Sequence, residues 1–505
     1  MPAATATGEA TKTAVPYLEM HETHTGVVVL AGDRAYKAKK PVLTDFLDFR
    51  APEQRERACR REVELNSRLS PDSYLGVAQL SDPAGGPPEP VIVMRRYSDQ
   101  NRLASMVFRD SDESVRGALD AIAGLLADFH RDAKRSPAIS AQGGAAAVER
   151  RWRENLSELR RYADASTPGV TAEAVSRIER LVAQYIAGRA PLFERRVVQK
   201  CIVDGHGDLL ADDIFWVDGK PALLDCLEFD DELRYVDCID DAAFLAMDLE
   251  FLGRKDLAGH FLERYAQHSG DTAPSSLCDF YIAYRAVVRA KVDCVRLSQG
   301  KHAAAQDARR HLAIATGHLE SGAVRLALVG GNPGTGKSTL ARALAGRVGA
   351  QVISTDDVRR ELRDAGTIGG DSGVLDAGLY SVDNVAAVYE SVLHRARPLL
   401  SAGQSVILDG TWRDPDARTQ ARRLAAETHS AFVELMCSVT IDAAGWRIAT
   451  RPAGNSEVTP EIAAVLAAQR SGWDSAHLID TSARPEEAAR EAHDVWQHQR
   501  LAEKE

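Results

Sequence analysis

The spacing of hydrophobic residues near the start of the chain predicts strands on either side of one charged helix. Residues 26–40 (GVVVLAGDRAYKAKK) contain two short apolar runs around a Gly-Asp pair, which predicts two strands joined by a tight turn. Residues 52–69 mix charged and apolar positions as a helix does. The run at 89–97 (EPVIVMRRY) follows a Pro/Gly loop at 83–90 and predicts a buried strand.

The pattern then becomes mainly helical. A strand-rich segment at 197–229 interrupts it, and a polar, Ala-rich helical stretch at 300–320 ends it. A β-rich small part followed by a helical large part indicates a bilobal layout. The predicted helices span 112–134, 145–164, 171–189, 240–266 and 275–299.

From Val324 onward, short apolar runs alternate with helical segments. This alternation is typical of a parallel sheet with crossover helices. We therefore place a domain boundary near 320, with a first domain at 16–320 and a second at 321–505. The small lobe of the first domain ends at about 96, and 1–15 is a disordered tail. The predicted strands of the second domain are 324–330, 350–355, 404–410, 431–437 and 475–481.

Composition and charge narrow the class of protein. A chain of 505 residues is too long for one hydrophobic core, so more than one domain is expected. The net charge of −11 argues against nucleic acid or an anionic membrane as the main partner. Seven scattered Cys without a CxxC pair favour a reducing cytoplasm, and we expect neither a secretory signal nor a membrane span.

The clearest motif is GNPGTGKST at 331–339, which follows an apolar strand and opens a helix. This is the Gly-x-x-x-x-Gly-Lys-Ser pattern of a phosphate-binding loop in its required context. Glycines let backbone N–H groups face a phosphate, Lys337 would reach the β/γ-phosphates of ATP, and Ser338 would bind Mg²⁺. The predicted nucleotide-binding residues are Gly331, Asn332, Pro333, Gly334, Thr335, Gly336, Lys337, Ser338 and Thr339.

A second set of candidates follows the next strand. Asp356 and Arg359 lie three residues apart on one face of a starting helix. The Asp can accept a proton from an acceptor hydroxyl, and the Arg can hold the acceptor or a phosphate. The alternative is a helix N-cap at Thr355 or Asp356 with surface charges around it.

Two further features fit phosphoryl transfer. Asp409 ends the strand SVILDG, where a carboxylate can order the Mg²⁺ shell; the alternative is an ordinary strand-end turn. Arg447 and Arg451 lie four residues apart, so they share a helix face and can close over a transferring phosphoryl group. A solvated helix face would show the same spacing.

Together these residues make 324–505 resemble the small P-loop kinases of the gluconate kinase and polynucleotide kinase 5′-end type. The resemblance rests on the phosphate loop, Asp356-x-x-Arg359, the strand ending ILDGTW, the Arg447/Arg451 pair and the closing HLIDTS strand. It implies phosphoryl transfer to a hydroxyl group.

The first domain carries HGDLLADDIF at 206–215, followed by a predicted hairpin whose second strand ends at Asp225. Carboxylates at the ends of paired strands can converge. One could act as base or orient a hydroxyl, and another could carry Mg²⁺. The alternative is a hairpin with ordinary turn aspartates.

This order of residues resembles the aminoglycoside phosphotransferase family. The resemblance implies that Asp208 is the catalytic base and that Asp213 and Asp225 bind metal. Upstream, RAYKAKKP makes Lys37 the candidate ATP-phosphate lysine and Glu62 its ion-pair partner, with Lys39 and Glu64 as alternatives. Two departures stand out: Asp213 replaces the family's Asn, and no Gly-rich loop precedes the lysine.

The expected architecture is an α+β bilobal, protein-kinase-like domain followed by an α/β P-loop kinase domain with a parallel sheet. It resembles proteins called bifunctional aminoglycoside phosphotransferase/ATP-binding proteins. The resemblance implies an ATP- and Mg²⁺-dependent phosphotransferase with two sites, acting on a hydroxyl of a small molecule such as a sugar or amino sugar.

Two other functions stay open. The first domain could be a non-catalytic binding module that regulates the P-loop domain, as the two departures suggest. A weaker alternative is an end kinase for nucleic acid, against which the net charge speaks.

Overall fold

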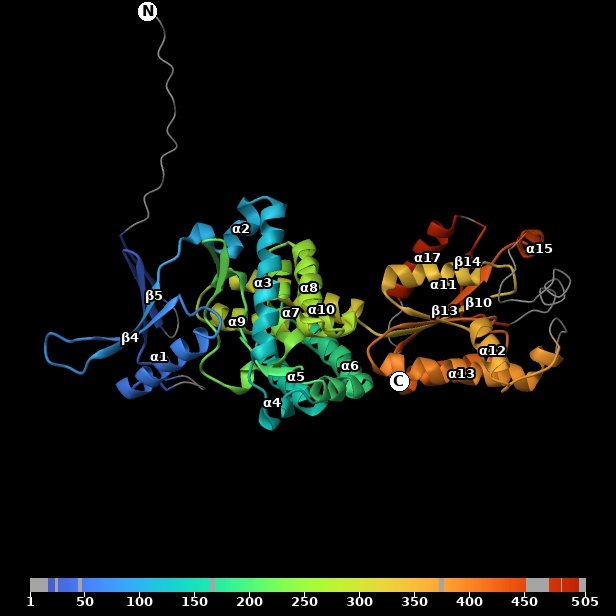
Figure 1. Cartoon of the computed structure of the whole chain (residues 1–505), viewed down its shortest axis with the longest axis horizontal. Helices are drawn as coiled ribbons and strands as arrows, with labels where there is room; N and C mark the ends of the chain where they lie inside the picture. Colours follow the sequence, from blue (N-terminus) through green and yellow to red (C-terminus); the bar gives the residue numbers. More distant parts are fainter. Residues whose placement is uncertain are drawn as a thin grey trace, which may run out of the picture. The chain divides into compact units, whose positions relative to one another are not determined.

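The computed structural model describes residues 17–22, 26–43, 48–163, 169–371, 377–450, 472–482 and 484–498. These residues form two compact units (Figure 1). The first unit comprises the described parts of Met1–Arg135 and Val203–Asp271, and the second those of Ser136–Ile202 and Thr272–Glu505. The predicted tail at 1–15 lies outside the described residues.

A five-stranded antiparallel sheet begins the first unit, with strand order β1-β2-β3-β5-β4. The predicted hairpin at 26–40 and the strand at 89–97 are confirmed. Gly32 has a φ of 58°, which is why the β2–β3 turn needs glycine. The strands are β1 (Leu18–Glu22), β2 (Gly26–Ala31), β3 (Arg34–Lys39), β4 (Tyr74–Leu80) and β5 (Glu89–Arg95).

Helix α1 (Pro52–Asn66) packs on this sheet through a small core of Cys59, Tyr74 and Ile92. Pro52 occupies the first helical turn, where its missing N–H costs nothing, and the Gln54 side chain accepts a hydrogen bond from the N–H of Ala51. These two features start the helix so that its buried face meets β4 and β5.

In the helical lobe of the first unit, helix α2 (Leu103–Arg109) was not predicted, and one predicted helix differs from the structure. The single helix expected at 240–266 is two helices, because the chain turns at Gly253, whose φ is 86°. The elements are η1 (Asp99–Asn101), α2 (Leu103–Arg109), α3 (Asp112–Asp132), β6 (Ile202–Asp204), η2 (Ala211–Asp213), β7 (Ile214–Val217), β8 (Lys220–Leu223), η3 (Glu232–Arg234), β9 (Tyr235–Asp237), α7 (Cys238–Phe251) and α8 (Lys255–Ser269).

The second unit begins with a group of helices around an aromatic core. Tyr185 stacks on Phe280 with ring centroids 4.4 Å apart, and Trp152 packs against the same Phe280. The helix predicted at 171–189 continues through Pro191 to Val198, so the strand-rich segment starts later than expected. The helices are α4 (Pro137–Ala141), α5 (Ala145–Arg160), α6 (Ala172–Val198), α9 (Ser275–Ser298) and α10 (Ala304–Ser321).

The predicted parallel sheet is confirmed in the second unit, with strand order β11-β12-β10-β13-β14. Figure 1 shows α11 and α17 on one face of this sheet and α12 and α13 on the other. The elements are β10 (Arg325–Gly330), α11 (Lys337–Val348), β11 (Gln351–Ser354), α12 (Thr355–Asp364), η4 (Gly378–Tyr380), α13 (Val382–Ser401), β12 (Val406–Asp409), α14 (Pro415–Glu427), β13 (Ala431–Ser438), α15 (Ile441–Thr450), β14 (His477–Asp480) and α17 (Pro485–His498).

Buried apolar residues of alternate strand positions fill the space beneath α11 and α17. They include Ala327 and Val329 of β10 and Leu340 and Leu344 of α11. The parallel sheet with helices on both faces confirms the α/β class predicted for this part of the chain. The domain boundary near 320 stays a prediction.

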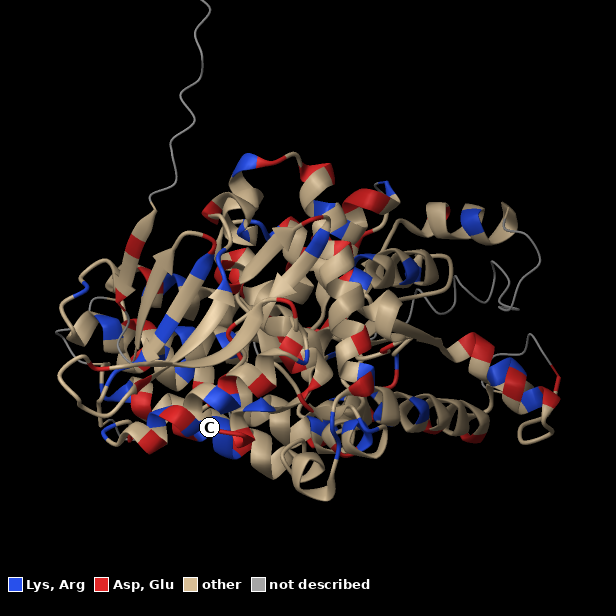
Figure 2. Ribbon diagram, turned by 60° about the vertical axis from the view of Figure 1, so that its left-hand side comes forward, with Lys and Arg blue, Asp and Glu red and all other residues tan. Residues whose placement is uncertain are grey.

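Charges of both signs are interspersed along the helices of each unit (Figure 2). None of the helices in the described part of the chain combines the length and the hydropathy that a membrane crossing requires.

Candidate active sites

The phosphate loop connects β10 to α11 and adopts a conformation that only glycine fits at two positions. Gly331 and Gly334 have φ angles of 131° and 81°. A Cβ at Gly331 would lie 2.6 Å from the carbonyl oxygen of Cys437, and one at Gly334 would lie 2.6 Å from that of Ala444. The backbone therefore curls tightly at the start of a helix, which is the arrangement that binds a phosphate.

Hydrogen bonds within the loop hold this curl. The Thr335 hydroxyl donates to the carbonyl oxygen of Asn332 over 2.8 Å, and the Thr481 hydroxyl donates to that of Thr335 over 2.6 Å. The Lys337 ammonium donates to the same Asn332 oxygen over 3.0 Å, so it lies across the loop. Among the residues that the structure describes, a phosphate can replace this neutral partner without breaking an ion pair.

Asp409 and Ser338 meet beside the loop. Asp409 ends β12, opposite Val329 of β10, and is 5% exposed. Burial raises the pKa of the Asp409 carboxyl, although a hydrogen bond with Ser338 and the charge of Lys337 partly oppose the shift. A hydroxyl and a carboxylate side by side are oxygen donors of the kind that Mg²⁺ prefers, so these residues fit the ion.

Asp356 and Arg359 form an ion pair on α12, with 2.7 Å between Asp356 Oδ1 and Arg359 Nη1. The Arg359 guanidinium also lies 4.7 Å from the ring centre of Tyr380. The N-cap of the helix is Ser354, so the alternative of a cap at Thr355 or Asp356 is wrong. The pair sits near Asp409, whose carboxyl senses the charge of Asp356.

Two aromatic residues that the sequence reasoning missed hold the loop after Asp409. Trp412 is fully buried with a φ of 52°, an unusual value for a bulky residue. The Tyr389 hydroxyl accepts the N–H of Trp412 over 3.1 Å and lies 3.2 Å from the Thr411 hydroxyl. The letters DGTW after a strand could have indicated Trp412, but no local pattern singled out Tyr389.

Arg447 lies on α15 with its side chain directed toward the phosphate loop. Its Nη2 donates to the carbonyl oxygen of Thr481 over 2.7 Å, and its Nη1 would be 3.5 Å from a Cβ at Gly336. Arg447 thus reaches the place where phosphates would bind. Its predicted partner Arg451 lies outside the described residues.

The first unit holds a chain of alternating charges between β3, α1 and the segment after β8. Lys37 Nζ lies 2.8 Å from Glu62 Oε1, and Lys39 Nζ lies 2.6 Å from Glu62 Oε2. Neither contact to Glu62 has the alignment of a hydrogen bond, so both are ion pairs in character. Each lysine also contacts a second carboxylate, Asp225 for Lys37 and Glu228 for Lys39.

These contacts distinguish the two candidate glutamates of the ion pair, but not the two lysines. Glu62 is fully buried and contacts both lysines, whereas Glu64 is exposed and pairs with Arg61. Burial works against the charge on Lys37, but Asp225 and Glu62 outweigh it and raise the pKa of the ammonium well above its usual value.

The loop that carries Asp208 is held by a buried carboxylate, Asp241, which the sequence reasoning also missed. Asp241 accepts the backbone N–H of His206 over 2.7 Å and that of Gly207 over 2.9 Å. His130 Nε2 lies 3.0 Å from the same carboxylate. Burial opposes ionisation of Asp241, but these hydrogen bonds lower its pKa below the usual range.

His206 supports the same loop in its neutral form. Burial lowers the pKa of the imidazole. Its Nδ1 accepts the N–H of Asp208 over 3.3 Å, so Nε2 carries the proton and donates to the carbonyl oxygen of Leu224 over 3.1 Å. The ring joins the Asp208 loop to the chain just before Asp225.

Asp208, Asp213 and Asp225 are close enough to influence one another's charge. Burial, followed by Asp225 and Asp208, raises the pKa of Asp213 well above its usual value. Lys37 lowers the pKa of Asp225, to which it donates a hydrogen bond over 2.6 Å. Such crowding of carboxylates fits a divalent cation.

Protein side chains would supply only part of a metal's coordination here. Within the described ranges, no three His, Cys, Asp or Glu side chains form a group that could hold a metal ion. Mg²⁺ commonly takes one or two carboxylates and completes its shell with phosphate oxygens and water. The predicted metal residues fit that kind of site.

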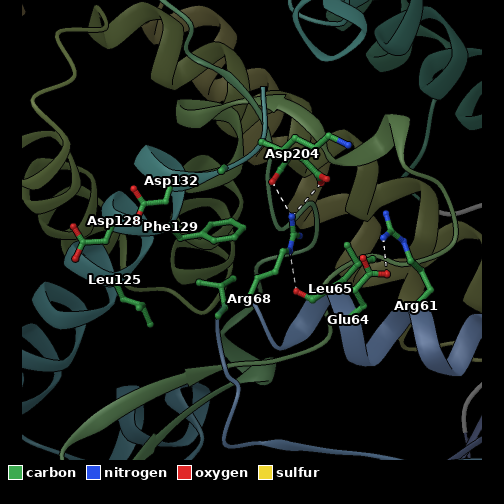
Figure 3. Close-up of a pocket in the computed structure, with 12 residues that line it drawn as sticks. Arg61, Glu64, Leu65, Arg68, Leu125, Asp128, Phe129, Asp132 and Asp204 are labelled. Carbon is green, nitrogen blue, oxygen red and sulfur yellow. Dashed lines mark hydrogen bonds and ion pairs between the residues drawn. The ribbon is translucent and has the colours of Figure 1, made fainter. Parts of the chain in front are cut away.

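A pocket of about 500 Å³ lies beside this site, between one face of α1 and one face of α3 (Figure 3). Arg68 and Phe129 face each other across it, with 5.1 Å from the guanidinium to the ring centre. Arg68 donates to the carbonyl oxygens of Asp204 and Gly205, directly before the HGD sequence. Asp208, Asp213, Asp225 and Lys37 do not line this pocket.

Comparison with known proteins yields both close and distant relationships. The AAA domain family (AAA_33) matches residues 326–474. The Mycobacterium tuberculosis protein named "Uncharacterized protein Rv2004c" is 65% identical over 481 residues, which cover 95% of this chain and 96% of the relative. That match spans both predicted domains.

Two solved structures resemble separate parts of the chain. A choline/ethanolamine kinase family protein from Mesorhizobium loti is 16% identical and covers 61% of this chain and 94% of its own, with a TM-score of 0.36. A gluconokinase from Sinorhizobium meliloti is also 16% identical and covers 34% of this chain and 90% of its own, with a TM-score of 0.27.

Proposed function

Because the chain belongs to the same family as its mycobacterial relative, and joins an aminoglycoside phosphotransferase-like part to a P-loop kinase part, we propose that it is an ATP- and Mg²⁺-dependent phosphotransferase with two sites. The acceptor is a hydroxyl group of a small molecule such as a sugar, an amino sugar or a related metabolite.

One observation carries most of this proposal. The glycine loop at 331–336 places Lys337 across its mouth and the Ser338–Asp409 pair beside it. Backbone N–H groups and a lysine neutralise phosphates, and the oxygen pair suits Mg²⁺. An acceptor hydroxyl would give its proton to Asp356, and Arg359 would hold the acceptor or a phosphate.

Roles in the first unit follow the same chemistry. Asp208 takes the proton of the acceptor hydroxyl, while Lys37 binds a phosphate after leaving Asp225. Asp213 and Asp225 would hold Mg²⁺, and the ion would supply positive charge opposite the charge that develops during transfer. Asp241 and His206 keep the loop in place for this step.

The test uses the full-length protein, γ-labelled ATP, Mg²⁺ and a panel of sugars, amino sugars and nucleosides. Lys337→Ala and Asp208→Asn are assayed separately, with Arg347→Ala and Asp218→Asn as exposed controls in the same regions. We expect each phosphorylated product to disappear with one of the two site variants and to persist with both controls. Turnover unaffected by either site variant would overturn the proposal.

A second candidate function is favoured by the Lys37–Asp225 contact together with Asp213 in the place of Asn. In this alternative the first unit binds a ligand without catalysis and regulates the P-loop site. Its signature is MgATP turnover that Lys337→Ala abolishes and Asp208→Asn leaves unchanged for every acceptor.

A further inference from the structure

We propose that Tyr389 is a positioning residue of the P-loop site. Its hydroxyl holds the left-handed turn at Trp412, and this turn fixes the Asp409 carboxylate in the place where it would meet Mg²⁺. The inference rests on the proposed nucleotide binding by the second unit. It assigns to that site a residue of α13, which is distant in the sequence from the phosphate loop.

The backbone at Trp412 adopts a conformation that this type of residue does not favour. Its φ of 52° lies in the left-handed region, where a bulky side chain is strained. Such a conformation persists only where the surrounding contacts hold it. Because Trp412 is fully buried, solvent cannot supply these contacts and the protein must do so.

Every hydrogen-bonding group of Trp412 has a partner. Its backbone N–H donates to the Tyr389 hydroxyl over 3.1 Å, and its indole N–H donates to the carbonyl oxygen of Leu408 over 3.1 Å. Its carbonyl oxygen accepts a hydrogen bond from Arg418 Nη1 over 2.7 Å. The rings of Tyr389 and Trp412 also pack together, with 4.7 Å between their centres. The turn is therefore held from α13, from β12 and from α14.

Thr411 connects this turn to the phosphate loop. Its carbonyl oxygen accepts the N–H of Gly331, the first glycine of the loop, over 3.3 Å. Its hydroxyl lies 3.2 Å from the hydroxyl of Tyr389. One residue separates Thr411 from Asp409 in the chain, so the two contacts of Thr411 also restrict how the chain can turn at the end of β12.

The phosphate loop has hydrogen bonds of its own, whereas Asp409 depends on the turn that follows it. The hydroxyls of Thr335 and Thr481 hold the curl of the loop through contacts that do not include Tyr389. Asp409 is the last residue of β12, so its backbone direction is set in part by the residues after it. Loss of the Tyr389 hydroxyl should therefore disturb this carboxylate more than the glycines of the loop.

The test compares the binding of a non-hydrolysable ATP analogue in Mg²⁺ and in EDTA, measured by calorimetry. The parent is full-length Lys37→Met protein, so that binding by the first site does not contribute, and Lys337→Ala identifies the second-site signal. Tyr389→Phe removes only the hydroxyl and leaves the N–H of Trp412 buried without its partner. We expect the strengthening of binding by Mg²⁺ to fall about 10-fold, whereas affinity in EDTA should change by less than about 3-fold.

A double-mutant cycle tests whether the effect passes through Asp409. In Asp409→Asn protein the strengthening by Mg²⁺ should already be reduced, and adding Tyr389→Phe should change it by less than about 3-fold. Tyr185→Phe is the matched control, since Tyr185 is also buried and its hydroxyl lies 3.1 Å from that of Ser276, outside the phosphate loop. This control should bind as the parent does in both conditions.

A role limited to stabilising the fold predicts different results. In that case Tyr389→Phe would weaken binding equally in Mg²⁺ and in EDTA, or would bind as the Tyr185→Phe control does. Either result overturns the proposal while leaving the proposed P-loop site intact, and so does an undiminished effect of Tyr389→Phe in the Asp409→Asn protein. If the parent shows no Lys337-dependent binding, both this inference and the proposed second site are wrong.

A second variant covers the case in which Tyr389→Phe does not fold. Arg418 holds the other side of the same turn, because its guanidinium donates to the carbonyl oxygens of Trp412 and Arg413 over 2.7 and 3.0 Å. Arg418→Lys keeps the charge, but one ammonium group does not reproduce the fork of the guanidinium. The proposal predicts the same selective loss of the Mg²⁺ effect. Affinities in Mg²⁺ and in EDTA that fall together would contradict it.

Discussion

The candidate phosphate-binding lysines of the two sites lie in very different surroundings. In the second unit, Lys337 donates to one neutral carbonyl oxygen and lies within the loop that would bind the phosphate. In the first unit, Lys37 contacts two carboxylates, one of them 188 positions away in the chain. The proposed P-loop site would accept a phosphate without losing an ion pair of Lys337 that the described residues show, whereas a phosphate at the first site would displace Lys37 from Asp225.

This difference has a thermodynamic meaning. A phosphate that approached Lys337 would replace a neutral hydrogen bond, while one that approached Lys37 would compete with ionised Asp225. Mg²⁺ bound by Asp225 would remove this competitor. We therefore expect nucleotide binding at the first site to depend on Mg²⁺ more strongly than binding at the second.

The largest expected effect is on chemistry at the first site. Asp208→Asn removes the proposed general base, so turnover of first-site acceptors should fall about 100- to 10,000-fold. Nucleotide affinity should change little, because the base contacts the acceptor. The measurement is kcat for a first-site acceptor, with Asp218→Asn in the exposed hairpin turn as control. Equal turnover of the two variants would remove Asp208 from the mechanism.

The next-largest effect is a loss of stability when Asp241, which holds the loop of the first site, is removed. Asp241→Ala leaves the N–H groups of His206 and Gly207 and the ring of His130 without their carboxylate. The loss of one partner from such a buried group typically costs about 3–5 kcal/mol. Thermal unfolding should show this loss, and second-site nucleotide binding should persist. Stability equal to that of the exposed control Asp132→Ala would contradict the assigned role.

At the P-loop site, Lys337→Ala should lower second-site turnover about 100- to 1,000-fold, the usual effect of losing one group that stabilises developing charge. First-site turnover should be unchanged. Kinetics with one acceptor for each site test both statements together, and Arg347→Ala at the end of α11 is the control. Loss of both activities would mean that the sites are not independent.

The contrast between the sites also explains what the sequence could predict. The P-loop, the parallel sheet and the β2–β3 hairpin were predicted because each depends on neighbouring residues. For the lysine–glutamate ion pair of the first site, the sequence left two lysines and two glutamates as candidates. Helix register alone does not decide which glutamate side chain is buried. Asp241 and Tyr389 were missed because each acts on a loop distant in the sequence, through tertiary contacts without a local pattern.

The smallest effect concerns Asp213 and depends on pH. Its pKa is raised in the folded protein, mainly by burial and then by Asp225 and Asp208. Such a carboxyl favours the folded state when protonated, so stability is lost as pH rises from the unfolded pKa of about 3.9 through the folded one. Without metal, Asp213→Asn should stabilise the protein by on the order of 1 kcal/mol at pH 8 and by less at pH 5.

Thermal unfolding in EDTA at the two pH values checks this prediction. A variant less stable than the parent at pH 8 would show that Asp213 is not repelled by its neighbours. Adding Mg²⁺ and nucleotide should reverse the order of stability, because the carboxylate is the better Mg²⁺ ligand.

The most direct test of two phosphate-binding sites is the stoichiometry of a non-hydrolysable ATP analogue, measured by calorimetry on the full-length protein with Mg²⁺. The account predicts two molecules bound per chain, and one in each of Lys337→Ala and Lys37→Met. A stoichiometry of one in the unaltered protein, abolished by Lys337→Ala and unaffected by Lys37→Met, would contradict it.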